Sequence, residues 1–154
     1  MKTVIILFAA VLFCSASLFS QKLTEDKVPT SVKAAFRAKF PKVITVSWEM
    51  EDKKEYEASF KEDKLDVTAS FDLSGKWQET ESVIDAAKLP KVISDVVSKQ
   101  FAGYTIKVAE QTVSAKGTEY ELSLLKGTDK KTVVISDKGI VQKKEVEKDE
   151  EDKK

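Results

Sequence analysis

Histidine is absent from this chain of 154 residues, and cysteine occurs only once, as Cys14. Zinc sites, nucleophiles activated by a histidine and imidazole acid–base chemistry depend on these two residue types, so the sequence excludes them. The five glycines are scattered and form no phosphate-binding loop. Lys and Arg number 26, as do Asp and Glu, so no basic excess is available to bind nucleic acid. The sequence therefore predicts a protein with no cofactor, no metal site and no nucleic-acid partner.

The first twenty residues have the pattern of a secretory signal peptide. Lys2 is followed by an apolar run over residues 4–13 and then by small residues at 14–17. A membrane-spanning helix needs about 20 apolar residues, so this run is too short for one; a buried core helix is the alternative. We expect residues 1–20 to be removed by cleavage near Ser20, and the protein to be periplasmic or secreted.

Cys14 raises the separate question of a lipid anchor, which would be attached to the cysteine that follows a cleavage site. The residue before that cysteine should be small, and here it is the bulky Phe13. We therefore expect no lipid anchor at Cys14. Loss of residues 1–20 would leave a domain without any cysteine, so packing alone has to hold it together.

The C-terminal end is rich in charge of both signs. Residues 143–154 contain 11 charged side chains. Such a segment cannot bury enough apolar surface to become ordered. We therefore expect a charged, disordered tail at 146–154.

Several landmarks of the chain occur twice in the same order. The segment EYEASF at 55–60 recurs as EYELSL at 119–124, after 64 residues. An internal repeat of this kind predicts two copies of one structural unit, at 21–82 and 83–145. The other repeated landmarks are Gly75 and Gly139, also 64 residues apart, and Val28-Pro29 and Leu89-Pro90, 61 residues apart.

Each unit is predicted to begin with an amphipathic helix whose first turn carries a proline, Pro29 or Pro90. Apolar residues then occur at i, i+3, i+4 and i+8, which places them in one stripe along an otherwise charged helix. Such a helix lies on another element of the protein. The two stripes are Val32, Ala35, Phe36 and Phe40 in the first unit, and Ile93, Val96, Val97 and Phe101 in the second.

About four strands are predicted after each helix, because apolar and polar residues alternate there. In the first of them, the expected apolar side consists of Ile44, Val46, Trp48 and Met50. One apolar face per strand is typical of an antiparallel sheet with helices on one side and water on the other. We therefore predict the α+β class, with two tandem helix-plus-four-strand units and both helices on one sheet face. The expected strands are 43–50, 55–61, 65–71, 76–82, 105–113, 118–125, 131–136 and 140–145.

This layout resembles the PepSY-like family of secreted bacterial proteins, which is described as similar to β-lactamase inhibitor proteins. The resemblance covers about residues 23–144. It implies a tandem repeat whose sheet forms a continuous, concave surface, a periplasmic or surface location, and a role in binding or inhibiting another protein. The matching features are the signal peptide, Val28-Pro29, Leu89-Pro90, Phe40-Pro41, Glu-Tyr-Glu at 55–57 and 119–121, and Gly75-Lys76-Trp77.

The resemblance to β-lactamase inhibitors is architectural only. Those inhibitors carry disulfides, and residues 21–154 contain no cysteine. No inhibitory residue is therefore carried over to this chain.

The polar side of the sheet is the first candidate binding surface. If Tyr56 and Phe60 point at the helix, the residues between and beside them point away from it. Fixed carboxylates and hydroxyls on such a face could dock a loop or a basic segment of a partner. The simpler alternative is a polar face that needs no ligand. The residues concerned are Glu55, Glu57, Ser59 and Lys61, and in the second unit Glu119, Glu121 and Ser123.

Aromatic side chains are the second candidate, because Trp and Tyr anchor many protein interfaces. Trp48 and Tyr56 lie on the apolar sides of their strands and are expected in the core. Trp77 follows a turn and begins a strand with a weak apolar pattern. We therefore expect Trp77 to be the more exposed of the three and a candidate partner contact.

Paired carboxylates are the third candidate. Glu55 and Glu57 lie two residues apart on one strand, about 7 Å by backbone rise, a spacing that glycosidase chemistry would permit. The sequence contains no insertion that would form a pocket, however, and acids on an open sheet are expected to keep ordinary pKa values. We therefore predict that the protein is not an enzyme.

The leading hypothesis is a secreted, non-enzymatic module that binds a protein partner, such as a peptidase or another hydrolase, through its exposed sheet face or an edge strand. The alternative is a structural or stress-related envelope protein that assembles with copies of itself. No membrane span is expected in either case.

Overall fold

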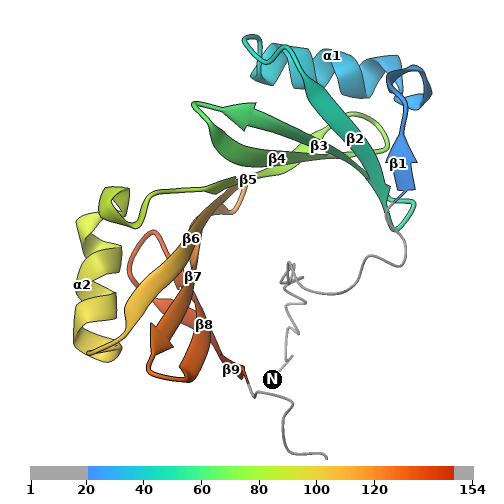
Figure 1. The fold of residues 1–154 in the computed structure, drawn as a ribbon. Helices are drawn as coiled ribbons and strands as arrows, with labels where there is room; N and C mark the ends of the chain where they lie inside the picture. The colour runs from blue at the N-terminus through green and yellow to red at the C-terminus, as the bar shows by residue number, and fades with distance from the viewer. Residues whose placement is uncertain (1–20, 148–154) are drawn as a thin grey trace, which may run out of the picture.

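The computed structural model describes residues 21–147, which form one nine-stranded antiparallel sheet and two α-helices (Figure 1). Strand order in the sheet follows chain order from β1 to β9. The predicted leader at 1–20 lies outside the described residues, as does most of the tail predicted at 146–154. The elements are β1 (Gln21–Leu23), η1 (Glu25–Lys27), α1 (Thr30–Lys39), β2 (Val46–Glu51), β3 (Glu55–Glu62), β4 (Leu65–Asp72), β5 (Trp77–Val83), η2 (Ala86–Lys88), α2 (Lys91–Gln100), β6 (Thr105–Ser114), β7 (Gly117–Lys126), β8 (Asp129–Ser136) and β9 (Val141–Glu147).

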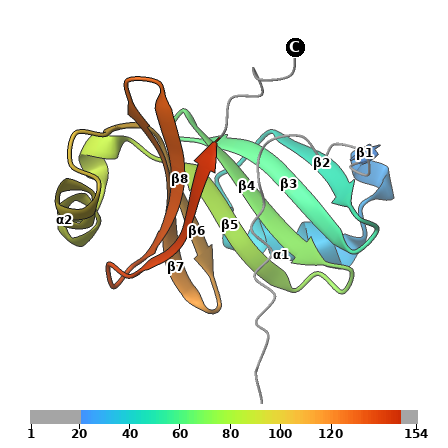
Figure 2. The ribbon, with the colours of Figure 1, turned by 90° about the horizontal axis from the view of Figure 1, so that it is seen from below.

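Both helices lie on the convex side of the sheet, which bends near β5 and β6 (Figures 1 and 2). Helix α1 precedes β2 to β5 and helix α2 precedes β6 to β9, so the fold belongs to the α+β class. The predicted apolar stripes face the sheet as expected: Val32 and Phe36 of α1 are buried, and so are Ile93 and Val97 of α2.

Each helix covers an apolar core of its own. In the first, the ring of Phe36 meets the rings of Trp48 and Phe60 edge-on, with centroids 5.3 and 5.4 Å apart. The second core is mainly aliphatic and includes the fully buried Leu122 and Ile135. Burying one side chain of this size contributes about 1.5–3 kcal/mol. The two cores share no residue, so each half of the sheet is stabilised separately on its helix side.

Two hairpin turns pack directly against the beginnings of the helices. Gly75, between β4 and β5, has φ +92°, and a Cβ there would lie 2.9 Å from the backbone of Ser31. Gly139, between β8 and β9, has φ +77°, and its Cβ would lie 2.8 Å from Cγ2 of Val92. Glycine is required at both turns by the left-handed backbone and by the lack of space.

Ile44 does not take the inward position that the alternating pattern predicted. The backbone N–H of Val43 donates to the carbonyl of Phe40 at 3.2 Å, and Arg37 donates to the carbonyl of Val43 at 2.6 Å. These bonds hold the chain in a turn after α1 that buries Val43, and β2 begins only at Val46. Ile44 is consequently 89% exposed.

The two edges of the sheet differ from the sequence prediction. Strand β1 was not predicted, yet its three residues pair with β2. At the other edge, β9 extends to Glu147, two residues past the predicted end of the second unit. Its last residues pair with Lys130 and Lys131 of β8. Backbone pairing with an existing strand can order residues whose own composition is too charged to fold alone.

We expect Gly75→Ala to destabilise the protein by about 2–4 kcal/mol, because the clash with α1 adds to the cost of a left-handed backbone. Gly127→Ala is a matched control, since Gly127 also has positive φ, at +60°, but has open space around it. Its expected cost is only about 1–2 kcal/mol. Urea unfolding measures both values, and equal losses would show that the turn does not press on the helix.

Candidate functional site

The concave face of the sheet, opposite the helices, holds the residues that the sequence proposed for partner binding, with the exception of Trp77. In β3, Tyr56 and Ala58 are buried in the first core, so strand alternation directs their neighbours to the concave face. In β7, Tyr120 and Leu122 are buried in the second core, so their neighbours also point to the concave face. The six predicted residues on this face are Glu55, Glu57, Ser59, Glu119, Glu121 and Ser123.

The strand register adds further glutamates to this face. Glu57 lies opposite both Glu49 and Ser70, and Ser70 lies opposite Glu79 of β5. Glu81 lies between Thr68 of β4 and Thr112 of β6, and Thr112 lies opposite Glu119. We call the resulting set the acidic face. Its members are Glu49, Glu51, Glu55, Glu57, Glu79, Glu81, Glu110, Glu119 and Glu121.

Three pairs of these glutamates lie directly opposite each other on neighbouring strands. Directly opposed side chains have Cβ atoms about 4.5–5.5 Å apart, and like charges at that spacing destabilise a sheet. Burial and the nearby charges of Asp52 and Glu55 accordingly raise the pKa of Glu51. Glu49, by contrast, also has Lys22 of β1 opposite it on its other side. The opposed pairs are Glu49 with Glu57, Glu51 with Glu55, and Glu110 with Glu121.

Burial and mutual repulsion change the acidity of the central carboxyls. Burial, with the nearby charges of Glu51 and Glu49, raises the pKa of Glu57 to about 6. Burial, with the charges of Glu79 and Glu110, raises the pKa of Glu81 to about 7. The expectation that acids on this sheet keep ordinary pKa values was therefore wrong. The sheet is curved, so its concave side removes these groups partly from water.

The pKa is also raised, mainly by burial, for the carboxyls of Glu51, Glu79 and Glu110. Sequence reasoning missed Glu79 and Glu81 because β5 has no clear apolar face from which to assign the other face. Their i, i+2 spacing was the available signal. A nearby Lys116 opposes the rise at Glu79.

Trp77 does not belong to the acidic face. A β-bulge makes Trp77 pair with Phe71 while Glu79 pairs with Ser70, which leaves Gln78 as an extra residue. Trp77 is thereby turned to the helix side, where it is half-buried and packs against the first core. Its Nε1 donates to Thr80 at 2.9 Å, and Nζ of Lys39 lies 3.7 Å from its ring centroid. Trp77 is more exposed than the buried Trp48 and Tyr56, as predicted, but it faces the helix side because the bulge breaks strand alternation. Its role as a partner contact stays a prediction.

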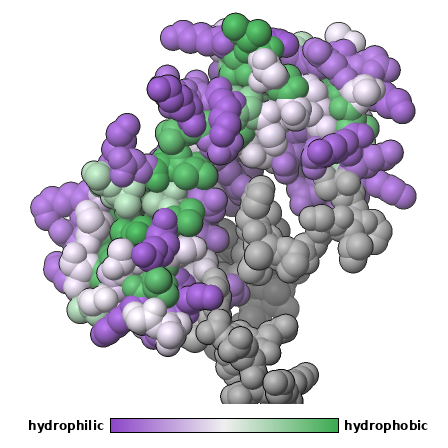
Figure 3. Space-filling view, viewed as in Figure 1, coloured by the Kyte–Doolittle hydropathy of each residue, from purple (hydrophilic) through white to green (hydrophobic). Residues whose placement is uncertain are grey.

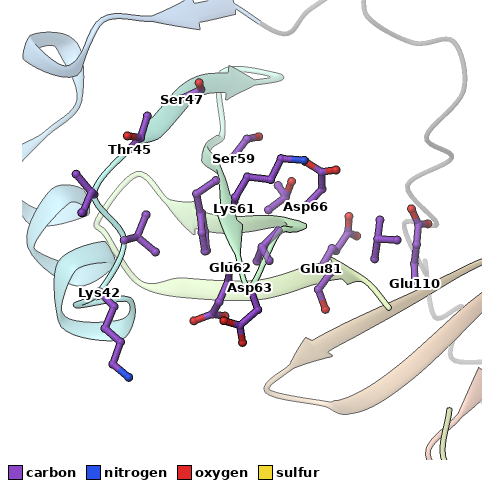
Figure 4. A pocket seen from close by; sticks show the side chains of 17 residues that line it. Lys42, Thr45, Ser47, Ser59, Lys61, Glu62, Asp63, Asp66, Glu81 and Glu110 are labelled. Atoms are coloured by element: carbon purple, nitrogen blue, oxygen red, sulfur yellow. The ribbon is translucent and has the colours of Figure 1, made fainter. Parts of the chain in front are cut away.

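An open groove of about 1120 Å³ runs along one side of the concave face, from the turn before β2 to β6 (Figure 4). Its lining includes Ile44 and Val83 as apolar residues and Glu81 and Glu110 as acids. In Figure 4 Lys61 and Asp66 point toward one another, and their ion pair is 2.5 Å long. The groove is a surface hollow rather than an enclosed active-site cavity.

Surface chemistry on the side shown in Figure 3 is dominated by hydrophilic side chains, with apolar surface in separate patches. Over residues 21–147, no group of three or more His, Cys, Asp or Glu is arranged to hold a metal ion. In the same part of the chain, neither helix is long and apolar enough to cross a membrane. Charge is thus the most prominent chemical feature of the site.

A family model described as "Putative beta-lactamase-inhibitor-like, PepSY-like" matches residues 18–68 and 54–143. No curated protein matches the chain.

Several solved structures from Bacteroides share the fold. A DUF2874 family protein from Bacteroides ovatus is 20% identical, with 77% of this chain and 86% of that chain covered and a TM-score of 0.69. A BLIP-like protein from Bacteroides fragilis is 16% identical, with 82% and 91% covered and a TM-score of 0.69. A protein from Bacteroides eggerthii described as "putative periplasmic proteins" is 17% identical, with 77% and 88% covered and a TM-score of 0.69.

We expect the free energy of unfolding to fall as pH rises from about 4.5 to 7. The pKa of Glu81 is raised from 4.5 to about 7 on folding, so the folded state binds more protons in this window. The contribution of Glu81 to stability is therefore fully present below its pKa in the unfolded chain and is lost as the pH rises through its pKa in the folded protein. Glu81→Gln should stabilise the protein by about 1–2 kcal/mol at pH 7.5, after allowance for solvent screening, and bring no gain at pH 4.5.

Denaturant unfolding of both proteins at the two pH values measures this difference. Glu62→Gln, at the exposed end of β3, is the control and should leave stability unchanged at both. A wild-type protein that becomes more stable between pH 4.5 and 7 would contradict the expectation.

Proposed function

Because the chain belongs to the PepSY-like, beta-lactamase-inhibitor-like family, whose model matches most of its length, we propose that it is a non-enzymatic module that binds another protein through the acidic face. The family assignment confirms the resemblance inferred from the repeated landmarks. The observation that carries the proposal is the set of directly opposed glutamate pairs on the concave side of the sheet.

A face that served only solubility would not need this arrangement. Soluble surfaces usually intersperse charges of both signs, and this chain has as many basic as acidic residues with which to do so. On this face Lys22 and Lys61 lie among the acids, but glutamates predominate and occupy five strands, from β2 and β3 through β5 and β6 to β7. Functional sites are places where proteins tolerate local arrangements that lower stability.

The chemistry of the face favours a cationic segment of the partner. A loop or extended segment that carries Lys or Arg would neutralise the carboxylates and be guided to them by long-range attraction. The adjoining groove offers Ile44 and Val83 for apolar contacts beside the charged ones. A typical interface buries about 800 Å² on each partner, so such a segment would need to span both halves of the face.

A peptidase or another hydrolase is our proposed class of partner. This step rests on analogy with the inhibitor-like description of the family and not on any residue of the site. Inhibition would follow if the cationic segment that occupies the acidic face belonged to the rim of the hydrolase active site.

We also propose that residues 1–20 are a secretory leader, that the protein acts in the periplasm or outside the cell, and that residues 21–82 and 83–145 are copies of one unit. Support for the copies comes from the order of one helix followed by four strands, which occurs in both halves, and from the equivalent packing of Gly75 and Gly139 on the helices. The description of the Bacteroides eggerthii protein supports the location.

Reversal of two charges on the acidic face tests the proposal. The wild-type protein is immobilised and exposed to periplasmic extract at low salt, and we expect it to retain a partner. The double variant Glu57→Lys with Glu121→Lys should bind that partner more than tenfold less tightly, because repulsion replaces attraction. Glu25→Lys with Asp137→Lys is the control, since it makes the same charge change at exposed sites away from this face.

Equal retention by the acidic-face variant and the control would contradict a binding role for this face. Static light scattering on the purified protein separates the alternative of self-assembly: a monomer agrees with a binding module, and a stable oligomer that hides the concave face favours assembly.

A further inference from the structure

The junction between the two halves of the sheet contains no fully buried residue. It consists of five residue pairs that join Glu79–Val83 of β5 to Glu110–Ser114 of β6. None of the seven residues of β5 is fully buried, and only Ala109 of β6 is. Each apolar core ends before this junction, which lies between the two helices (Figure 1).

The helix side of the junction offers little apolar contact. Thr80 and Ser82 of β5 face that side, opposite Val113 and Gln111 of β6. Val113 is 37% exposed, so the side chains there do not form a sealed core. The backbone ladder is consequently the main link between two separately stabilised halves, and a link of this kind permits bending.

The concave side of the same junction carries three glutamates, Glu79 and Glu81 from β5 and Glu110 from β6. The uncharged Thr68 and Ser70 of β4 lie directly opposite Glu81 and Glu79 of β5. The charged groups around the three are Glu51 of β2, Glu55 and Glu57 of β3, Glu119 and Glu121 of β7, and Lys116 of the β6–β7 turn. Farther along the groove, Lys61 and Asp66 neutralise each other.

Repulsion at this place has a mechanical consequence. Side chains on the inner side of a bend come closer together when the bend tightens, so like charges there oppose closure. The raised pKa values of Glu79, Glu81 and Glu110 indicate that these groups already crowd one another or lie partly out of water. Neutral carboxyls would remove this electrostatic resistance to closure of the bend.

We propose that the β5–β6 junction is a joint whose angle is set by the charge of Glu79, Glu81 and Glu110. When these groups are ionised they hold the two halves apart, and when they are neutralised the halves close over the concave face. Protons neutralise Glu81 at mildly acidic pH and, because burial raises the pKa of Glu79 and Glu110, bind to those two carboxyls more readily than to exposed ones. The cationic segment of a partner neutralises them on binding, and this second route rests on the proposed function. The acidic face would thereby close around its partner.

The distance between the two helices reports the angle between the two halves of the sheet. Because α1 and α2 lie on the convex side, closure of the concave side moves them apart (Figure 1). Ala38 and Lys99 are exposed positions on the two helices, and Cys14 is the one native cysteine. Spin labels on the full-length chain with Cys14→Ser, Ala38→Cys and Lys99→Cys give this distance by pulsed electron paramagnetic resonance.

We expect the distance between the labels to be longer at pH 5 than at pH 8 by about 2 Å or more. Glu81→Gln with Glu110→Gln should give the long distance at both pH values. Glu25→Gln with Asp137→Asn is the control and should keep the pH response of the parent. If the double variant does not fold, Glu81→Gln alone should still reduce the change in distance between pH 5 and pH 8.

An equal distance at pH 5 and pH 8 in the parent, or an undiminished response in Glu81→Gln with Glu110→Gln, would overturn the joint. The proposed function fails separately. A distance that changes with pH in a protein that retains no partner would uphold the joint and remove the binding role. A protein that retains a partner but shows no change in distance would uphold the binding role and overturn the joint.

Discussion

The crowding of glutamates on one face of the sheet is the constraint that the rest of this structure has to accommodate. Three like-charged pairs lie across neighbouring strands of one sheet face. Such pairs are tolerated because the opposite face carries two apolar cores under two helices, and because the backbone ladder is continuous across nine strands. The fold thus separates its roles by face: the convex side provides stability, and the concave side concentrates negative charge.

The bend of the sheet changes the acidity of these groups. On a flat sheet the glutamates would be well solvated, and their acidity would be ordinary. On the concave side, burial raises the pKa of Glu57 to about 6 and that of Glu81 to about 7. Glu81 lies at the junction between the halves, where no residue of β5 is fully buried. In the proposed joint, partner charge, proton uptake and the angle between the halves are linked through the glutamates of this junction.

Much of this architecture could be predicted from local patterns. The helix stripes around Phe36 and Val97 follow from a periodicity that neighbouring residues determine, and the position of Glu57 follows from strand alternation beside Tyr56. Ile44 was misplaced because a turn held by Arg37 interrupts that alternation. The helix-side position of Trp77 results from a bulge beside Phe71, which the pattern of β5 does not reveal. The raised pKa of Glu81 depends on glutamates from three other strands and on the curvature of the sheet, which no local pattern contains.

The most direct test is a titration of the glutamate side-chain carboxyl carbons in the folded protein by ¹³C nuclear magnetic resonance, from pH 3 to 9. The account predicts a midpoint near 7 for Glu81 and near 6 for Glu57. It also predicts that Glu110→Gln lowers the midpoint of Glu81, because one neighbouring charge is removed. Midpoints near the ordinary value of about 4.5 for both groups would contradict the account, since the concave face would then be a solvated surface without mutual repulsion.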